Sequence, residues 1–281
     1  MELLQIRKTE INVGLSKEYR LFQISDMHLS YCDELSSELD NSEHEHFHRQ
    51  WDTLKYDFAK RGNEYCDERY DIEPTVLFEL LCKYAIDIKA DAMILSGDIM
   101  DRVTDSNLRY LDEIFKSLPM PVIYCLGNHC YMNENGEKCI IQYERLKKII
   151  SQPEYSSTDF GEFEIVSIDN NKPISKEQLN FLKRKINSAK RLILVMHKPM
   201  LLGEFGEALH EKIGDYFFMG KDSDTEETKE LVKLVRDNDN RFIVALCGHI
   251  HFAREHKITE NLMQITTSSG LIGAGREIII K

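Results

Sequence analysis

Short apolar runs recur along the chain, and polar or glycine residues flank most of them. Runs of roughly four to eight residues that are rich in Ile, Val and Leu are typical of β-strands. Ala92–Ser96 and Leu192–Met196 are continuously apolar, which predicts strands that are covered on both faces. The predicted strands are Ile6–Val13, Leu21–Ser25, Ala92–Ser96, Val122–Leu126, Phe163–Ile168, Leu192–Met196, Phe242–Cys247, Glu255–Ile258, Met263–Thr267 and Glu277–Ile280.

Between these strands, apolar residues recur at helical spacing. This pattern predicts a helix over Glu73–Ile88, where Pro74 lies at a position that tolerates proline. Ser175 and Gln178 have the spacing of a capping box ahead of a helix over Leu179–Ile186. Further helices are predicted over Ser106–Ser117, Glu137–Ile150 and Thr225–Arg236. The alternation predicts an α/β fold, and because no repeat, low-complexity tract or linker divides it, we expect a single domain over residues 1–281.

Two segments depart from this alternation. Residues 32–71 are long, polar and acidic, and residues 201–224 combine several glycines with aromatic residues. Long insertions of this kind form lids or substrate walls in some proteins and a plain surface helix or loop in others. The sequence leaves both interpretations open for each segment.

The net charge of -12 argues against broad electrostatic binding to nucleic acid or to an anionic membrane. It is compatible with a phosphorylated substrate, because bound cations would reverse the sign of the local charge. Residues 1–11 lack the apolar core of a signal peptide, and no apolar run is long enough to span a bilayer. The seven irregularly spaced cysteines predict a cytoplasmic setting without disulfides, with Cys125 and Cys247 as buried thiols.

Five blocks of potential metal ligands follow predicted strands. They are Asp26-Met-His28, Gly97-Asp98-Ile-Met-Asp101, Gly127-Asn128-His129, His197-Lys198-Pro199 and Gly248-His249-Ile250-His251. Taken singly, each block has a simpler interpretation, such as a surface turn, a helix N-cap or a structural histidine. Together they supply carboxylates, an amide and several imidazoles, enough for two metal ions side by side. Paired metal ions usually hydrolyse phosphate esters.

Spacing within the blocks supports this interpretation. Residues two apart on an extended chain point to the same side, so Asp26 with His28, and His249 with His251, can each reach one ion. A carboxylate such as that of Asp98 can bridge two ions through its two oxygens. We expect Asp101 to orient another ligand rather than to bind metal itself.

In order, residue type and strand-end placement, the blocks resemble the calcineurin-like metallophosphoesterase superfamily from Asp26 to His251. The connecting piece Phe163–Leu182 resembles the corresponding segment of bacterial phosphodiesterase-type members. This resemblance implies a four-layer α-β-β-α sandwich, in which helices flank two facing mixed β-sheets.

The resemblance also implies roles for individual residues. All seven metal positions carry the family's residue type: Asp26, His28 and His251 for the first ion, Asn128, His197 and His249 for the second, and Asp98 bridging both. His129 would contact the phosphate and protonate the leaving oxygen, while a metal-bridging hydroxide attacks phosphorus in line. The carboxylate, amide and imidazole ligands suit two ions of Mn, Fe or Zn.

One position departs from the family pattern, which usually has Asp or Glu where this chain has Cys130. That carboxylate would help to orient the histidine, so its absence weakens the expectation that His129 is a strong acid. We expect Cys130 to be a packing residue, and a soft ligand that competes for zinc is the alternative.

Other polar residues have less specific patterns. Arg102, Lys198 and Arg254 lie beside the blocks and could bind phosphate, although exposed ion pairs are the simpler role for at least two of them. For His44, His46 and His48 we favour an exposed helix face that binds no metal over a third metal site.

We therefore expect an enzyme that hydrolyses a small phosphodiester, with cyclic nucleotides among the candidates. A phosphomonoesterase is the alternative on the same site, and a non-catalytic scaffold is disfavoured because the ligand set is intact. A nuclease is disfavoured by the net acidity and by the lack of a basic stripe.

Overall fold

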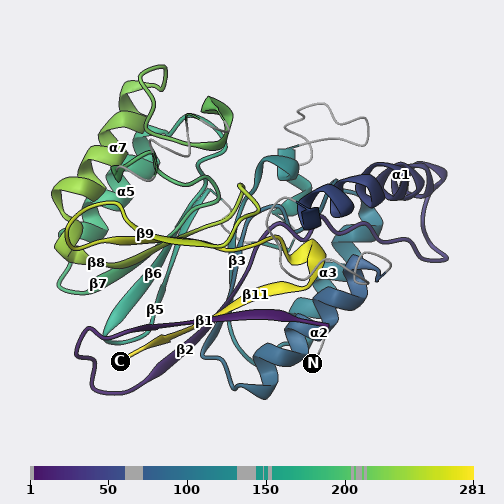
Figure 1. The fold of residues 1–281 in the computed structure, drawn as a ribbon, viewed down its shortest axis with the longest axis horizontal. Coiled ribbons are helices and arrows are strands. Elements are labelled where there is room, and N and C mark those ends of the chain that lie inside the picture. The colour runs from purple at the N-terminus through teal and green to yellow at the C-terminus, as the bar shows by residue number, and fades with distance from the viewer. Residues whose placement is uncertain are drawn as a thin grey trace.

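Two mixed β-sheets form the centre of the protein (Figure 1). The computed structural model describes residues 3–60, 72–131, 144–147, 149–150, 154–203, 206, 211 and 214–281. The first sheet has the order β1 (Gln5–Ile11), β11 (Ala274–Ile280), β2 (Tyr19–Ile24), β3 (Ala92–Ser96) and β4 (Val122–Cys125). The second sheet has the order β5 (Tyr155–Asp159), β6 (Phe163–Ile168), β7 (Arg191–Val195), β8 (Phe242–Cys247), β10 (Met263–Thr266) and β9 (Arg254–Lys257).

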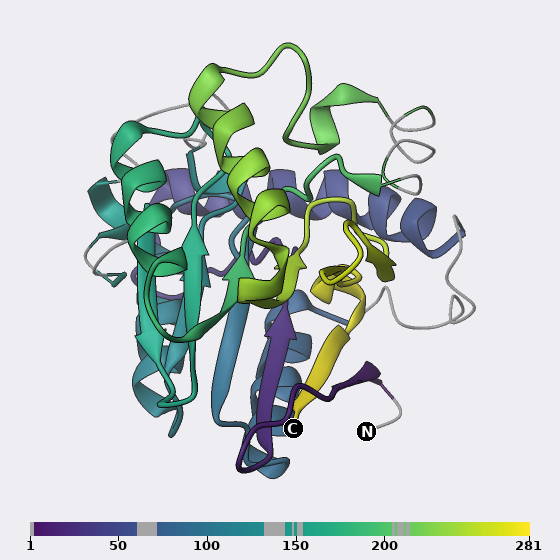
Figure 2. The ribbon, with the colours of Figure 1, turned by 90° about the vertical axis from the view of Figure 1, so that its left-hand side faces the viewer.

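Helices cover the outer face of each sheet (Figures 1 and 2). The helices α2 (Pro74–Asp87) and α3 (Asp105–Ser117) share one apolar core with β2 and β3. The helices α5 (Lys176–Ile186) and α7 (Glu226–Asp237) share a second core with β6, β7 and β8. A third core, which includes Leu21, Ile94 and Ile193, lies between the two sheets. This arrangement confirms the expected four-layer α-β-β-α sandwich.

The β2 strand shows how one sequence serves two of these cores. Successive side chains on a strand point to opposite faces, so Leu21 joins the core between the sheets while Phe22 packs against the helices. Both side chains are fully buried. Coverage on both faces explains why the central strands are mostly apolar rather than alternating, with Gln23 as a buried polar exception in β2.

Parallel pairing places the polar blocks together. The strands β2, β3 and β4 are parallel neighbours in the first sheet, and β6, β7 and β8 are parallel neighbours in the second. Parallel strands end at the same edge of a sheet, so each residue block that follows β2, β3, β4, β7 or β8 emerges there. Ligands bind at this edge in many open α/β sheets.

All the predicted strands are present, with ends that differ by a few residues, and the capping box of α5 forms as expected. The strand β5 was missed because its sequence, YSSTD, has no apolar alternation; it is the edge strand beside β6. The start of β11 was missed because a glycine and Arg276, which is buried against Glu255, interrupt its apolar pattern. Most of the helix predicted over Glu137–Ile150 lies outside the described residues.

The two irregular segments are described in part. The first contains α1 (Glu38–Lys60), whose Asp40 accepts a hydrogen bond from Ser106 at the start of α3 (2.9 Å). The second contains the short 3₁₀ helix η3 (Asp215–Phe217). Cys125 and Cys247 are fully buried, as predicted, and each cysteine that the structure describes is a free thiol. Among the described helices, none combines the length and apolarity needed to cross a membrane.

Candidate metal centre

Main-chain hydrogen bonds join the polar blocks across the strand ends. The amide of Asp26 donates to the carbonyl of Gly97 (2.9 Å), and that of His28 donates to the carbonyl of Asp98 (2.9 Å). In the second sheet, the amide of Gly248 donates to the carbonyl of His197 (2.9 Å). These main-chain hydrogen bonds fix the relative positions of the loops independently of their side chains.

Three groups of potential ligands lie within these loops. In each group the donor atoms are all within 4.8 Å of one another: Asp26, His28 and His251; Asp98, His197 and His249; and His28, Asp98 and His129. The first two groups contain the histidines and carboxylates that the sequence predicts for the first and the second ion. The structure therefore brings these predicted residues together, and their roles as ligands remain a proposal.

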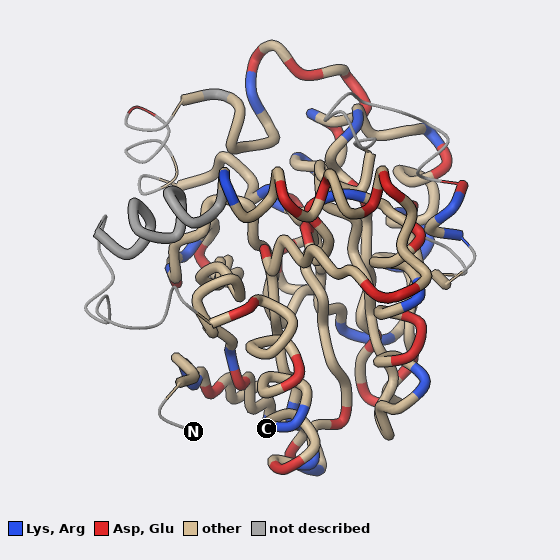
Figure 3. Tube along the Cα trace, turned by 90° about the vertical axis from the view of Figure 1, so that its right-hand side faces the viewer, with Lys and Arg blue, Asp and Glu red and all other residues tan. Residues whose placement is uncertain are grey.

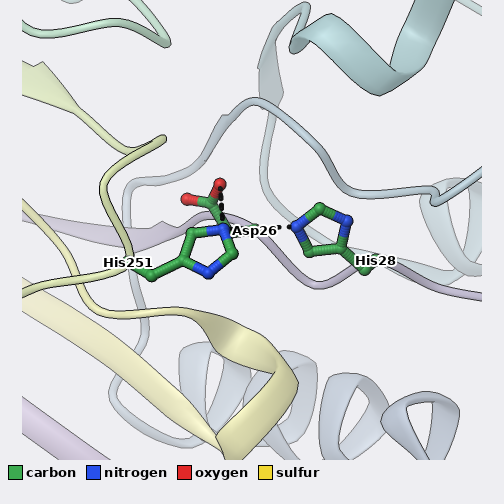
Figure 4. Close-up of side chains that lie close together, drawn as sticks. All are labelled: Asp26, His28 and His251. Atoms are coloured by element: carbon green, nitrogen blue, oxygen red, sulfur yellow. Dashed lines mark hydrogen bonds and ion pairs between the residues drawn. The ribbon is translucent and has the colours of Figure 1, made fainter. Parts of the chain in front are cut away.

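The first group converges on one imidazole. The Nε2 atom of His251 lies 3.2 Å from Oδ1 of Asp26 and 3.4 Å from Nε2 of His28 (Figure 4). The second group is built in a similar way, since Nε2 of His197 lies 3.0 Å from Oδ2 of Asp98 and 3.1 Å from Nδ1 of His249. Each group thus brings nitrogen and oxygen donor atoms within 4.8 Å of one another, close enough to share one cation.

Two buried atoms test whether metal ions fit. Oδ1 of Asn128, at the start of the 3₁₀ helix η2 (Asn128–Tyr131), and Nε2 of His249 are buried and have no hydrogen-bond partner within the described part of the chain. A buried polar atom without a partner costs roughly 1–3 kcal/mol. A bound cation would satisfy both atoms, so these residues fit the proposed metal centre.

The backbone at the predicted ligands is strained. A positive φ is rare for residues other than glycine. In the described residues it occurs at Lys89, at the end of α2, and at five predicted ligands: Asp26 (53°), His28 (46°), Asp98 (51°), His249 (69°) and His251 (58°). Such conformations cost about 1–3 kcal/mol each and concentrate at functional sites. The strain therefore marks the same residues as the ligand pattern in the sequence.

The carboxylates remain ionised despite their burial. Burial alone would raise the pKa of Asp98, but the charges of His197 and His129 and a hydrogen bond from His197 hold it well below its usual range. Burial alone would also raise the pKa of Asp26, but the charge of His251 and its hydrogen bond to the carboxylate lower that pKa. Both carboxylates are therefore charged acceptors at neutral pH.

Asp101 contacts both His129 and the predicted ligand His28, and its role in orienting a ligand stays a prediction. Nδ1 of His129 lies 3.0 Å from the carbonyl oxygen of Asp101 and 3.0 Å from its Oδ1 atom. The same Oδ1 atom lies 3.3 Å from Nδ1 of His28. Burial lowers the pKa of His129, but the charge of Asp98 and the hydrogen bond to Asp101 outweigh it and raise the pKa to about 9. This raised pKa favours the positively charged imidazole, with a proton on each nitrogen, at neutral pH. Bound cations would lower the pKa.

Cys130 packs away from the donor groups. Its thiol is fully buried, accepts a hydrogen bond from the amide of Gly127 (3.4 Å) and lies 3.6 Å from the hydroxyl of Tyr124. Burial raises the pKa of the thiol to about 12. These contacts support the packing role for Cys130, and Asp101 supplies the carboxylate beside His129.

The basic candidates differ in position. Nη1 of Arg102 lies 3.2 Å from both Nδ1 of His129 and Oδ2 of Asp101, so this arginine belongs to the centre. Nζ of Lys198 lies 5.0 Å from the centroid of the Tyr216 ring, beside the same centre. Arg254 is exposed at the start of β9. The ion pair of Arg102 is largely buried rather than exposed, with the arginine side chain 13% accessible.

Sequence reasoning missed Asn170. Its side-chain oxygen accepts hydrogen bonds from the amides of His197 (3.1 Å) and Lys198 (3.0 Å), and its Nδ2 donates to the carbonyl of Lys198 (2.7 Å). Asn170 therefore holds the turn that presents His197. The signal was present, because the polar run Asp169-Asn170-Asn171 follows an apolar strand as the five ligand blocks do.

We expect Asn170→Ala to lower the free energy of unfolding by about 2 kcal/mol or more, because buried amides lose their partner. It should also weaken metal binding by moving His197. Urea denaturation and metal titration would measure both effects, with Asn240→Ala at an exposed position as the control. If the free energy of unfolding and the metal affinity of the Asn170 variant are unchanged, the turn keeps its conformation without this side chain.

The comparisons agree with this geometry. Two facing sheets with carboxylates, imidazoles and an amide at their shared edge define a class of metal-dependent phosphoesterases. The model of the calcineurin-like phosphoesterase family matches residues 19–253, and the chain belongs to this family. It is a metal-dependent phosphoric ester hydrolase of the dinuclear type.

Solved structures share the fold at low sequence identity. A dimetal phosphatase from Danio rerio is 11% identical with a TM-score of 0.54, over 90% of this chain and 88% of that one. A purple acid phosphatase from yellow lupin (Lupinus luteus) seeds is 14% identical with a TM-score of 0.54, over 91% of this chain and 45% of the lupin chain. No curated protein sequence matches the chain.

Proposed function

We propose that the chain hydrolyses a small phosphodiester at the centre formed by Asp26, His28, Asp98, Asn128, His197, His249 and His251, with His129 as the proton donor. The observation that carries hydrolysis is the convergence of two donor groups with His129 beside Asp98. When bound, two metal ions would acidify a water molecule and neutralise charge on the phosphoryl oxygens. The phosphodiesterase-like segment Phe163–Leu182 supports a diester and makes cyclic nucleotides the first class to test.

The chain's own residues supply the remaining chemistry. Asp101 holds Nδ1 of His129, which leaves Nε2 as the nitrogen that can give a proton to the departing oxygen. Arg102 and Lys198 place positive charge beside the centre, where an anionic phosphate would bind. Asn170 keeps His197 in place during turnover.

The ligand chemistry limits the metals. The predicted donor set contains no thiolate, since Cys130 points toward Gly127 and Tyr124. Carboxylate, amide and imidazole donors suit Mn, Fe or Zn, and we propose two ions from this set.

The charge distribution supports a small substrate. Basic and acidic segments are interspersed along the described trace in Figure 3, and the net charge is -12. A long nucleic acid would be repelled by most of such a surface. A small phosphorylated molecule would meet mainly the metal ions and the basic residues next to them.

Hydrolysis of bis(p-nitrophenyl) phosphate and of p-nitrophenyl phosphate, each with added Mn²⁺, tests the proposal. We expect the diester to be the better substrate, and a screen of cyclic nucleotides would follow. Turnover of the monoester alone would overturn the diester assignment and indicate a phosphatase. Absence of turnover with metal bound would favour a scaffold role.

An exposed aromatic ring beside the centre gives the diester a place for its second substituent. Tyr216 is 52% accessible, and its ring centroid lies 5.4 Å from that of His249. An aromatic group stacked on this ring would gain roughly 0.5–1.5 kcal/mol. Tyr216, from the segment 201–224, thus contributes to the wall of the site.

We expect Tyr216→Ala to lower kcat/KM for bis(p-nitrophenyl) phosphate by about five- to tenfold, since the stacking surface is lost. Tyr216→Phe keeps the ring and should stay close to wild type. Steady-state kinetics of the two variants checks this. Equal losses in both would assign the effect to the hydroxyl group instead.

A further inference from the structure

Two of the three clustered histidines face each other outside the donor groups of the candidate metal centre. Nε2 of His44 lies 3.2 Å from Nε2 of His48, four residues later on α1. Of the exposed face that we favoured, exposure is confirmed only for His46, since His44 and His48 are half-buried. Two imidazole nitrogens at this separation on one helix turn form a ready chelate.

A carboxylate lies beside one of these two imidazoles. Oε2 of Glu73 lies 3.5 Å from Nε2 of His48. Glu73 precedes α2 as its N-cap residue, but its side chain makes no capping hydrogen bond, so its carboxylate is not committed to the helix. Three potential ligands thus come from two helices that are separated in the sequence.

A further contact fixes the orientation of one ligand. Nδ1 of His44 lies 3.1 Å from the hydroxyl of Ser30. When Nδ1 donates its proton to that oxygen, Nε2 carries the lone pair that a metal needs. Metal-binding histidines usually have such a partner on the other ring nitrogen. Burial and the neighbouring His48 also lower the pKa of His44, which favours the neutral ring that a ligand needs.

We propose that His44, His48 and Glu73 bind a third cation, of the zinc class that favours imidazole, and that this ion fastens α1 to the start of α2. The alternative is a hydrogen-bonded pair of imidazoles in which His48 also forms an ion pair with Glu73, and zinc content distinguishes the two. Ser30 lies two residues after His28, so the ion would also steady α1 against the loop of the metal centre. This proposal does not rest on the proposed phosphodiesterase activity.

The experiment compares zinc content among matched variants of the full chain. Each protein is stripped with a chelator, loaded with Zn²⁺, desalted and analysed for metal per chain. We expect His44→Gln and His48→Gln to hold one zinc ion fewer than wild type. His46→Gln, an exposed position on the same helix, is the control and should hold as many as wild type.

A second variant and a second measurement keep the test decisive. If circular dichroism shows that the histidine variants are unfolded, Glu73→Gln replaces them, since it removes the carboxylate and no capping bond. Its zinc affinity should be about tenfold lower. Zinc should slow amide hydrogen exchange in α1 of wild type and His46→Gln, and not in His48→Gln. Equal zinc content and equal exchange in the His46 and His48 variants would overturn the third site.

Discussion

Replacing Asp98 by Asn should reduce turnover of bis(p-nitrophenyl) phosphate by about a thousandfold or more. Oδ1 of Asp98 accepts a hydrogen bond from the amide of His129 (2.8 Å), and Oδ2 faces Nε2 of His197 at 3.0 Å. The asparagine must keep its oxygen toward the His129 amide. Its NH₂ group then faces His197, where a cation needs an acceptor, so the variant should lose both the bridge and its negative charge.

The matched control is Asp112→Asn. Asp112 lies on α3, where its side chain is 38% accessible and pairs with Lys116. Exposed ion pairs contribute about 1 kcal/mol or less, so this variant should keep its stability and its turnover. Metal content, thermal unfolding and turnover are measured for both proteins. An Asp98→Asn variant that binds metal and turns over normally would contradict the proposed bridge and move the metal site elsewhere.

The ligand blocks were predictable because their chemistry is local. An apolar run followed, at once or after a Ser or Gly, by a carboxylate or imidazole identifies a strand end, and parallel pairing then brings such ends together. Asp26, Asp98 and His197 therefore required no knowledge of distant contacts. The same logic would have found Asn170, had the polar run after Phe163–Ile168 been treated like the others.

Other features depend on contacts that sequence patterns do not encode. The polar strand β5 exists because β6 offers it a partner for main-chain hydrogen bonds, not because of its own side chains. Arg276 is buried in β11 because Glu255 and Thr9 lie beside it in the fold. His44 and His48 meet because α1 forms, and their approach to Glu73 depends on tertiary packing.

The left-handed backbone at the ligands links fold and function. Asp26, Asp98 and His249 occupy conformations that an unstrained loop would assign to glycine. The hydrogen bonds between the blocks hold them there, and bound cations would offset part of the cost.

Gly127→Ala should disable the centre through packing alone. A Cβ atom at this position would lie 2.0 Å from Oδ1 and 2.2 Å from the backbone nitrogen of Asp98. Unlike Gly97, Gly127 does not have a positive φ, so alanine could adopt its backbone conformation and only the clash remains. Since the obstructing atoms include backbone, rotating a side chain cannot relieve the clash. We expect a loss of about 3 kcal/mol in the free energy of unfolding, together with most of the turnover.

The control for this variant is Gly206→Ala, whose added Cβ would lie at least 3.8 Å from every atom of the other residues that the structure describes. Thermal unfolding is compared with and without Mn²⁺, beside turnover. Wild type and the control should be stabilised by the metal, because a ligand that binds only the folded state raises its stability. Gly127→Ala should gain little from Mn²⁺, since displacing Asp98 removes the proposed bridge between the ions. If the variant retains full stabilisation by Mn²⁺ and full turnover, Asp98 can move without loss, and the close packing of the strand-end loops is not what positions the metal ligands.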